Sequence, residues 1–331
     1  MHKFLIDWLI CPTCRSELAW DSQERTQEDI QQAVATCKNC GEMFSIQEGI
    51  GIFLASHLLR ADLWQQADSE LKRYLNEHLQ VKRELLQTPL KHLSPADQFF
   101  RHMILEEEGF YEQSQEAEKA ALRGMYTNEY MQAWQAQLEY VVEACSRHSG
   151  AIIDLASGRG YLAQRLLETG NPIVVTDFSV DVLRKNRMRM DHFGLSKQLS
   201  FLAVDARRTP FRDGVVPLLT TNVGLPNIEQ ADDLLAELRR ICGGEFLAIH
   251  HFFPRDDSIH QQVFAEMGNA VVHDEDALLA EFVNKHWKVT LENPLSALAK
   301  PTPKSVLLEG AEIDRIPLAD VILKWCTLRA S

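Results

Sequence analysis

The segment Ile152-Ile153-Asp154-Leu155-Ala156-Ser157-Gly158-Arg159-Gly160-Tyr161-Leu162 joins an apolar run to a glycine-containing turn and a helix. The apolar run predicts a buried strand with an acid, Asp154, near its end, and the helix is expected from Tyr161 to Glu168. Glycines let the backbone approach a ligand, and a helix N-terminus offers unpaired N–H groups. The pattern is typical of nucleotide-binding α/β proteins, although a plain tight turn also produces it.

Two further apolar runs end in an acid. Residues 172–179 end around Asp177, and residues 199–206 end around Asp205. A helix over 180–193 separates them. Because the carboxyl ends of parallel strands meet at one edge of a sheet, the three acids predict a cleft there. Asp177 follows the glycine turn by about 20 residues, where a ribose-binding carboxylate lies in doubly wound folds.

With these motifs, residues 126–331 resemble the class I S-adenosylmethionine-dependent methyltransferases, of the kind that includes ubiquinone/menaquinone-biosynthesis methyltransferases. The resemblance implies an α/β, doubly wound, seven-stranded, mostly parallel Rossmann-like sheet, with the last strand antiparallel between the fifth and sixth. It implies S-adenosyl-L-methionine as the cofactor, with Asp177 on the ribose hydroxyls and with Asp205 and Ala206 on the adenine. The cofactor-binding residues expected are Asp154, Ala156, Gly158, Gly160, Asp177, Phe178, Asp205, Ala206, Asn222 and Tyr126. Ala156 stands where many members of the family carry glycine.

Residues 1–55 contain two C-x-x-C pairs about 20 residues apart. Their cysteines, Cys11, Cys14, Cys37 and Cys40, predict a closed, structural Zn²⁺ site in a small zinc ribbon. A redox role would need one pair at a strand-to-helix turn, which neither has. Residues 5–54 resemble the zinc ribbon known as an activator subunit of tRNA and protein methyltransferases. Related ribbons precede bacterial methyltransferases, one group of which methylates a guanine of 23S ribosomal RNA, but the long insert that follows here departs from that group.

Residues 56–125 carry apolar residues at helical spacing and almost no strand pattern. We expect helices over 57–86, 95–107 and 112–123, and a further helix over 127–147 that begins the methyltransferase domain. The first helices are expected to form a lid over the cleft or a platform between the ribbon and the rest of the chain. Tyr126 and Tyr130 are then candidates to line the pocket, although packing aromatics would look the same.

The remaining strands are expected over 215–221, 244–253, 287–291 and 319–329, with a further short strand over 305–309 in a proline-containing excursion. Helices are expected over 232–240, 259–268 and 275–285. Asn222, at the tip of the fourth strand, is a candidate catalytic residue, or a turn residue only. His250 and His251 end the fifth strand and alternate in direction, so that one at most faces the cleft. It would act there as a base or be structural.

Composition limits the possible partners. The 331 residues are 45% hydrophobic with a net charge of -13 that is spread along the chain, so no basic domain is set apart for nucleic acid. No segment is apolar enough to cross a membrane and the N-terminus lacks a signal peptide, so a cytoplasmic protein is expected. A protein partner that binds the ribbon is also conceivable.

The sequence therefore predicts a methyltransferase that acts on an unidentified acceptor, a small molecule in preference to RNA. A ribosomal or transfer RNA base methyltransferase that uses the ribbon to contact RNA is the first alternative. A cofactor-binding scaffold without chemistry is the second.

Overall fold

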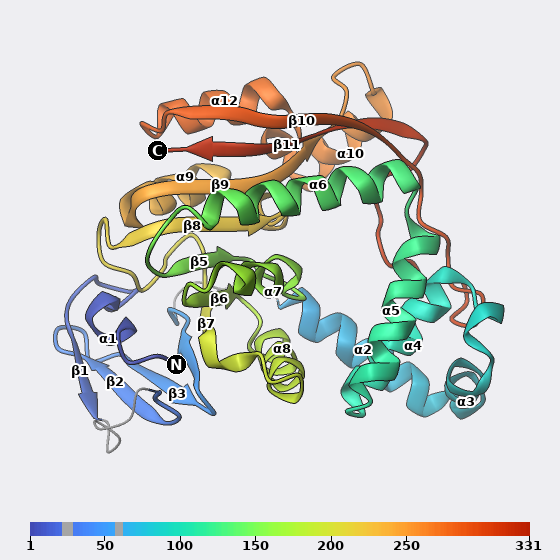
Figure 1. Ribbon diagram of the computed structural model, residues 1–331, viewed down its shortest axis with the longest axis horizontal. Coiled ribbons are helices and arrows are strands. Elements are labelled where there is room, and N and C mark those ends of the chain that lie inside the picture. The colour runs from blue at the N-terminus through green and yellow to red at the C-terminus, as the bar shows by residue number, and fades with distance from the viewer. Residues whose placement is uncertain (22–28, 57–61) are drawn as a thin grey trace.

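The computed structural model describes residues 1–21, 29–56 and 62–331. Its strands form one sheet in the order β1-β2-β3-β4-β7-β6-β5-β8-β9-β11-β10 (Figure 1). The strands are β1 (Leu18–Asp21), β2 (Ala33–Cys37), β3 (Met43–Gln47), β4 (Ile50–Phe53), β5 (Ile152–Leu155), β6 (Ile173–Asp177), β7 (Leu199–Val204), β8 (Val216–Asn222), β9 (Cys242–Phe252), β10 (Val289–Ala299) and β11 (Val321–Ala330).

The part of the sheet from β7 to β10 has the predicted seven-stranded order. The strands β7, β6, β5, β8 and β9 run parallel, and β11 lies antiparallel between β9 and β10. This reproduces the expected insertion of the last strand. The order reverses between β5 and β8, which is where a doubly wound sheet places its ligand.

The N-terminal ribbon extends this sheet to eleven strands, which the sequence did not predict. Within the seven-stranded part β7 is the last strand, and β4 pairs with its outer edge in parallel, from Ile50 against Phe201 to Phe53 against Val204. An unpaired edge favours such pairing. After the second cysteine pair, β3 and β4 form an antiparallel hairpin. The expected boundary near residue 55 falls between β4 and the first long helix.

The described helices agree closely with the periodicity of the sequence. They are α1 (Leu5–Trp8), α2 (Leu63–Glu77), α3 (Leu79–Gln87), α4 (Pro95–Glu107), α5 (Tyr111–Met125), α6 (Asn128–Cys145), α7 (Tyr161–Leu166), α8 (Val180–His192), α9 (Ala231–Ile241), α10 (Ser258–Met267), α11 (Ala270–His273) and α12 (Glu275–Asn284), with short 3₁₀ turns η1 (Leu90–His92), η2 (Leu167–Thr169), η3 (Ser196–Gln198) and η4 (Leu225–Asn227). The single helix expected over 57–86 is two helices, α2 and α3, and its first residues, 57–61, lie outside the described residues.

Two expectations for the C-terminal part are wrong. The sixth strand does not end at 291, because a register shift between Glu292 and Leu295 takes Pro294 out of the pairing and lets β10 continue. Residues 305–309 form turns and no strand. Their backbone is held by α4, where the Asp97 carboxylate accepts hydrogen bonds from the N–H groups of Val306 and Leu307 at 3.2 Å each.

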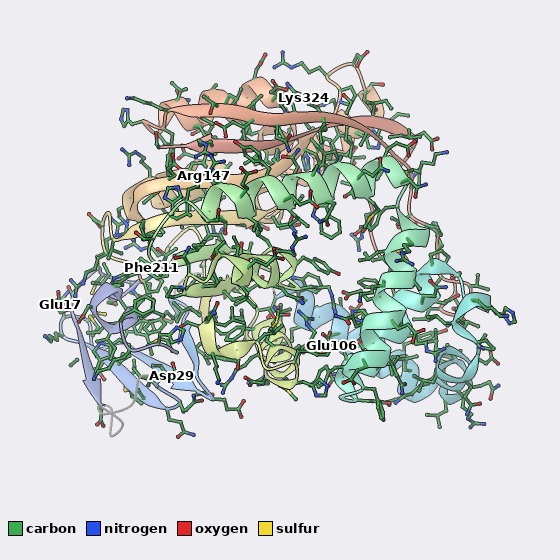
Figure 2. All side chains as sticks on the ribbon, in the orientation of Figure 1. Glu17, Asp29, Glu106, Arg147, Phe211 and Lys324 are labelled. Atoms are coloured by element: carbon green, nitrogen blue, oxygen red, sulfur yellow. The ribbon has the colours of Figure 1, made fainter. Side chains whose placement is uncertain are left out.

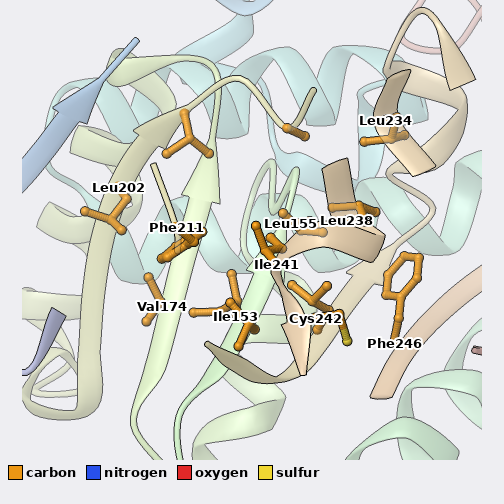
Figure 3. Close-up of a cluster of buried hydrophobic side chains, with 14 of the residues drawn as sticks. Ile153, Leu155, Val174, Leu202, Phe211, Leu234, Leu238, Ile241, Cys242 and Phe246 are labelled. Carbon is orange, nitrogen blue, oxygen red and sulfur yellow. The ribbon is translucent and has the colours of Figure 1, made fainter. Parts of the chain in front are cut away.

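Alternate residues of the central strands fill two apolar layers, one on each face of the sheet. Ile153, Leu155 and Val174 belong to the layer with α9 and α12 (Figure 3). Ile152 and Ile173 belong to the layer with α6, α7 and α8. Strands buried on both faces are typical of parallel sheets and explain the continuous apolar runs in the sequence.

The helices α2–α5 form a separate insert beside the sheet (Figure 1). Their own apolar contacts are small clusters around Leu85 and Phe99. Polar contacts to the glycine turn and α8, described with the candidate site, therefore help to fix the insert against the sheet.

Candidate active site

The turn after β5 has the left-handed backbone that its glycines allow. The φ angle is +49° at Gly158 and +74° at Gly160, and Ala156 adopts +47° although it carries a side chain. The Asp177 carboxylate at the end of β6 accepts a hydrogen bond from the Gly158 N–H at 2.9 Å. The helix α7 begins directly after Gly160. A hydrogen bond to β6 thus fixes the turn, and the N-terminus of α7 follows the turn directly.

A cavity of about 420 Å³, here called the β6–β7 cavity, lies beyond the ends of β6 and β7. Ala156 and Gly158 line it from the turn, Asp177 and Phe178 from the end of β6, and Ala206 from the segment after β7. These five were expected to bind the cofactor. The structure brings them to one wall.

A second cavity of about 430 Å³, here called the lid cavity, lies between the same turn and the insert. Tyr126 and Asn222, two further residues expected to bind the cofactor, line it together with Tyr130. The insert contributes Trp64 from α2 and Phe99 from α4. Ala156, Gly158 and Trp64 also line the β6–β7 cavity, so the glycine turn separates two adjoining spaces.

Asp154 is buried beneath the turn and reaches neither cavity wall. Its Oδ1 accepts a hydrogen bond from the Thr220 hydroxyl at 3.0 Å, and its Oδ2 has no hydrogen-bond partner. Burial raises the pKa of Asp154 to about 7. Gly160 also lines neither cavity. Both residues shape the turn from behind.

Asp205 differs from the expectation that its side chain holds an adenine. It is 1% exposed, and its carboxylate accepts hydrogen bonds from the Arg207 guanidinium at 3.0 and 2.7 Å. It lines neither cavity. The bidentate pair orients the carboxylate, and of the two residues expected at the adenine only Ala206 lines the β6–β7 cavity.

Buried ion pairs tie the insert to the glycine turn. Glu106 of α4 lies where the insert faces α8 (Figure 2) and pairs with Arg159 of the turn at 3.0 Å and with Arg189 of α8 at 2.6 Å. Glu118 of α5 pairs with Arg159 at 3.0 Å and accepts from the Tyr161 hydroxyl at 2.6 Å. Burial alone raises the pKa of Glu106, but the two arginines outweigh it and hold the pKa at about 2. We call this set the Glu106 network.

The tip of β8 has an unusual backbone. Val223 has a φ of +53°, a strained conformation for a β-branched residue, and its N–H donates to the carbonyl of Ile249 at 2.9 Å. Asn222 beside it accepts a hydrogen bond from the Trp134 indole N–H at 2.9 Å. Both Asn222 and Val223 line the lid cavity. The Asn222 side chain is thus positioned by α6.

The two histidines of β9 lie on opposite faces, as their alternation predicted. His250 is fully buried, and its Nε2 hydrogen-bonds the carbonyl of Val272 at 2.7 Å. It lines none of the cavities described here. His251 points the other way, packs on Trp325, and lines a third cavity next to the lid cavity. Of the two candidates, only His251 can meet a ligand.

The four cysteines of the ribbon converge. Their sulfurs lie within 4.8 Å of one another, with Cys11 Sγ 3.7 Å from Cys40 Sγ and Cys14 Sγ 3.4 Å from Cys37 Sγ. The backbone N–H groups of Asn39 and Cys40 point at Cys37 Sγ. Four thiolates at this separation fit one tetrahedral ion.

The sequence did not single out Trp64, Trp134 or Arg159 as site residues. Trp64 and Trp134 come from helices whose position over the turn no local pattern reveals. Arg159 had one signal, since it lies inside the glycine motif itself. Its partners Glu106 and Glu118 are distant in sequence and look like ordinary helix-surface acids.

Comparisons with known proteins show which family this part of the chain resembles. The sequence model of the ubiE/COQ5 methyltransferase family matches residues 125–283. This part of the chain is related to the ubiE/COQ5 methyltransferases. The resemblance predicted from the sequence is thereby confirmed, and the match includes the glycine turn, Asp177 and the tip of β8.

Individual relatives match over the same part. The ubiquinone/menaquinone biosynthesis C-methyltransferase UbiE of Stutzerimonas stutzeri is 25% identical over 155 residues, which are 43% of this chain and 60% of that protein. The UbiE of Acidiphilium cryptum is 32% identical over 114 residues, which are 34% of this chain and 46% of that protein. The chain thus spans about 60% or less of the length of these two relatives.

Among solved structures, the YcgJ protein of Bacillus subtilis aligns with 59% of this chain and 97% of its own, at a TM-score of 0.48 and 14% identity. Among the helices of the described residues, none has the length and apolar character needed to cross a membrane.

Proposed function

We propose that this protein transfers a methyl group from S-adenosyl-L-methionine to an acceptor bound under the insert. The observation that carries the proposal is the glycine turn between β5 and α7, with Asp177 bound to it and cavities on both sides. The family match over residues 125–283 includes the sequence of the glycine turn and Asp177, which supports the proposal. Bound S-adenosylmethionine would supply a methyl group on a positively charged sulfur.

The chain's own residues fit that cofactor. The Asp177 carboxylate at the wall of the β6–β7 cavity can accept hydrogen bonds from ribose hydroxyls, and Phe178 and Ala206 offer apolar surface for a base. Ala156 and Gly158 allow close approach to the backbone. The unpartnered Oδ2 of Asp154 lies one layer behind the turn and adds negative potential there when ionised.

The residues of the lid cavity would hold the acceptor and exclude water. Tyr126 at the end of α5, Tyr130 of α6 and Asn222 at the end of β8 line this space. Methyl transfer from a sulfonium depends mainly on proximity and alignment, so positioning by these side chains is the main contribution. Catalytic roles for Asn222 and His251 are part of the proposal, and His250 is excluded from it by its burial.

We favour a small molecule over RNA as the acceptor. The lid cavity lies under helices, and insert residues such as Phe99 line it, so an entering molecule must be small enough to pass them. The chain's net charge of -13 opposes RNA binding. For the ribbon we propose a structural Zn²⁺ held by Cys11, Cys14, Cys37 and Cys40.

The test is isothermal titration calorimetry with S-adenosylmethionine and S-adenosylhomocysteine. We expect the wild-type protein to bind with a micromolar dissociation constant. Asp177→Ala, which loses charge-assisted hydrogen bonds to the ribose, is expected to bind at least about tenfold more weakly than the wild type. Asp191→Ala, on the exposed side of α8, is the matched control and is expected to bind as the wild type does.

Failure of both ligands to bind folded protein would reject the proposal. Tight binding without methyl transfer to any of a panel of metabolites or RNAs would favour the scaffold alternative. Salt-sensitive binding and methylation of RNA would favour the RNA alternative.

A further inference from the structure

One carboxylate on the wall of the lid cavity differs from the other charged groups there. Five acidic and two basic side chains line this cavity. All of them except Asp314 form ion pairs, which are Asp68–Lys185, Glu106–Arg159, Asp181–Arg184 and Glu312–Lys304. Within the part of the chain that the structure describes, Asp314 forms no ion pair, and its carboxylate accepts a hydrogen bond from the Tyr126 hydroxyl. The wall of the lid cavity thus carries one carboxylate that a cationic ligand could pair with.

The environment of Asp314 favours such a cation. The residue lies in the segment between β10 and β11, outside the residues that the family model matches. Burial raises the pKa of its carboxyl, and the hydrogen bond from Tyr126 offsets part of this shift. A positive charge close to a partly desolvated carboxylate favours the ionised form, so a cation and the ionised Asp314 would stabilise each other.

Aromatic rings form much of the same cavity wall. Tyr126 and Tyr130 stack with centroids 4.7 Å apart and planes 9° from parallel, and Trp325 meets Tyr130 edge to face at 5.0 Å. Trp134 and Tyr161 form a second edge-to-face pair at 5.3 Å. All five rings line the lid cavity. Because the face of an aromatic ring attracts a positive charge, such a wall suits a cationic ligand with an apolar body.

The indole of Trp325 gives a second, independent indication of a polar ligand. Trp325 is 1% exposed and lines the lid cavity, and its Nε1–H has no hydrogen-bond partner. Buried N–H groups nearly always donate a hydrogen bond, and an indole N–H can only donate. A ligand that satisfies it must carry an acceptor atom such as a hydroxyl or carbonyl oxygen. An ammonium group has no acceptor, so the oxygen must be a second group on the same ligand.

We propose that the lid cavity takes an acceptor molecule with a cationic amino group and a neighbouring hydroxyl or carbonyl oxygen, and that Asp314 selects the cation. The Tyr126 hydroxyl holds the Asp314 carboxylate in place, and Trp325 donates to the oxygen. An anionic molecule in the same position would be repelled by Asp314. This inference rests on the proposed function, because it takes the lid cavity to be the acceptor site.

The test measures the binding of three probes of similar size to the full-length protein saturated with S-adenosylhomocysteine, by saturation-transfer NMR with titration. Phenylethanolamine is a cation at neutral pH, phenylethylene glycol has a hydroxyl in place of the amino group, and mandelate has a carboxylate there. We expect phenylethanolamine to bind at least about tenfold more tightly than phenylethylene glycol, and mandelate to bind most weakly.

Two variants separate the two contacts. Asp314→Asn removes the charge and keeps an acceptor for the Tyr126 hydroxyl, so the preference for phenylethanolamine over phenylethylene glycol is expected to fall to about threefold or less. Trp325→Phe keeps a ring and removes the N–H donor, so both probes are expected to bind about threefold more weakly or worse, with the preference between them unchanged. The matched control is Asp320→Asn, because Asp320 lies in the same segment, pairs with Lys300 and lines none of the three cavities. It is expected to keep the wild-type preference.

Equal binding of phenylethanolamine and phenylethylene glycol by the wild type would overturn the inference, as would an unchanged preference in folded Asp314→Asn. If Asp314→Asn instead weakens the binding of S-adenosylhomocysteine and leaves the preference intact, the carboxylate serves the amino group of the cofactor and the inference is wrong. Cofactor binding is measured first. A failure of S-adenosylhomocysteine to bind the wild type rejects the proposed function together with this inference, whereas its binding without a preference for phenylethanolamine rejects the inference alone.

Discussion

Asp154 is the residue whose environment departs most from what its place in the motif suggests. It is buried, one of its oxygens is unpaired, and its pKa is raised to about 7 from an ordinary value of 3.8. The folded protein therefore holds this proton up to a higher pH than the unfolded chain does. The buried carboxyl costs no stability below about pH 4, and stability falls as the pH rises from about 4 to about 7, the range in which only the folded protein keeps the proton.

Asp154→Asn removes this cost while it keeps the hydrogen bond with Thr220. We expect the variant to be more stable than the wild type by about 1–4 kcal/mol at pH 8, with the difference vanishing near pH 4. Urea unfolding at both pH values, without cofactor, measures this. A variant that is less stable than the wild type at pH 8 would show that the carboxylate is ionised and paired in the folded protein.

Residue-level chemistry was the most predictable part of the site. A glycine or an acid at a strand end restricts the local backbone, so the turn at Gly158 and the position of Asp177 could be read from spacing. The partner of Asp205 could not be predicted in this way. It depends on the conformation of the flexible Arg207 side chain, two residues away, which donates to the Asp205 carboxylate. For the same reason, alternation along β9 predicted that His250 and His251 lie on opposite faces but not which of them faces a cavity.

At the scale of elements, the Glu106 network holds the insert against the turn. The insert's own apolar clusters are small, whereas Glu106 and Arg159 are almost completely buried between α4 and the turn. Ion pairs removed from water depend on both partners, and losing one leaves the other uncompensated. The position of the lid over the cavity therefore depends on charge as well as on apolar contact.

Glu106→Gln leaves Arg159 and Arg189 without their shared carboxylate. We expect this substitution to lower the free energy of unfolding by about 3–5 kcal/mol, mainly because the insert detaches from the turn more readily. Limited proteolysis is expected to cut residues 63–125 faster in the variant. Glu107→Gln is the matched control, since Glu107 pairs with Lys72 and Lys185 in a half-exposed position and its loss is expected to cost about 0–1 kcal/mol. Equal cleavage rates in the two variants would contradict the role of the network.

At the scale of the whole molecule, contacts between segments that are distant in sequence could not be predicted from the sequence. Most helices and strands follow from local periodicity and were predicted, with β1, β2, α1 and α11 as exceptions, and the order of the seven strands followed from the family resemblance. The pairing of β4 with β7 depends on which edge stays uncovered in the assembled sheet. The strand expected over 305–309 failed for a related reason, since Asp97, some 200 residues away, holds that backbone.

Several contacts join the ribbon to β7 and to the segment that follows it. β4 pairs with β7, whose end leads to Ala206 on the cavity wall. The Arg208 guanidinium donates to the carbonyls of Pro12 and Thr13, between the first two cysteines, at 2.7 and 3.0 Å. The backbone of Ile10 donates to Pro210 at 2.6 Å. A disordered ribbon would thus release the segment that follows β7.

Cys37→Ser tests this connection, because it removes one of the four thiolates of the proposed zinc site and leaves the cavity residues untouched. We expect loss of the stoichiometric zinc, a lower melting temperature, and at least threefold weaker binding of S-adenosylhomocysteine by calorimetry, since Ala206 loses its support. Cys145→Ala, a buried cysteine under α6, is expected to keep the zinc. Zinc is measured by a chromogenic chelator after denaturation. Cys37→Ser protein that loses its zinc yet binds S-adenosylhomocysteine as the wild type does would show that the ribbon is a separate module that leaves the cofactor side unchanged.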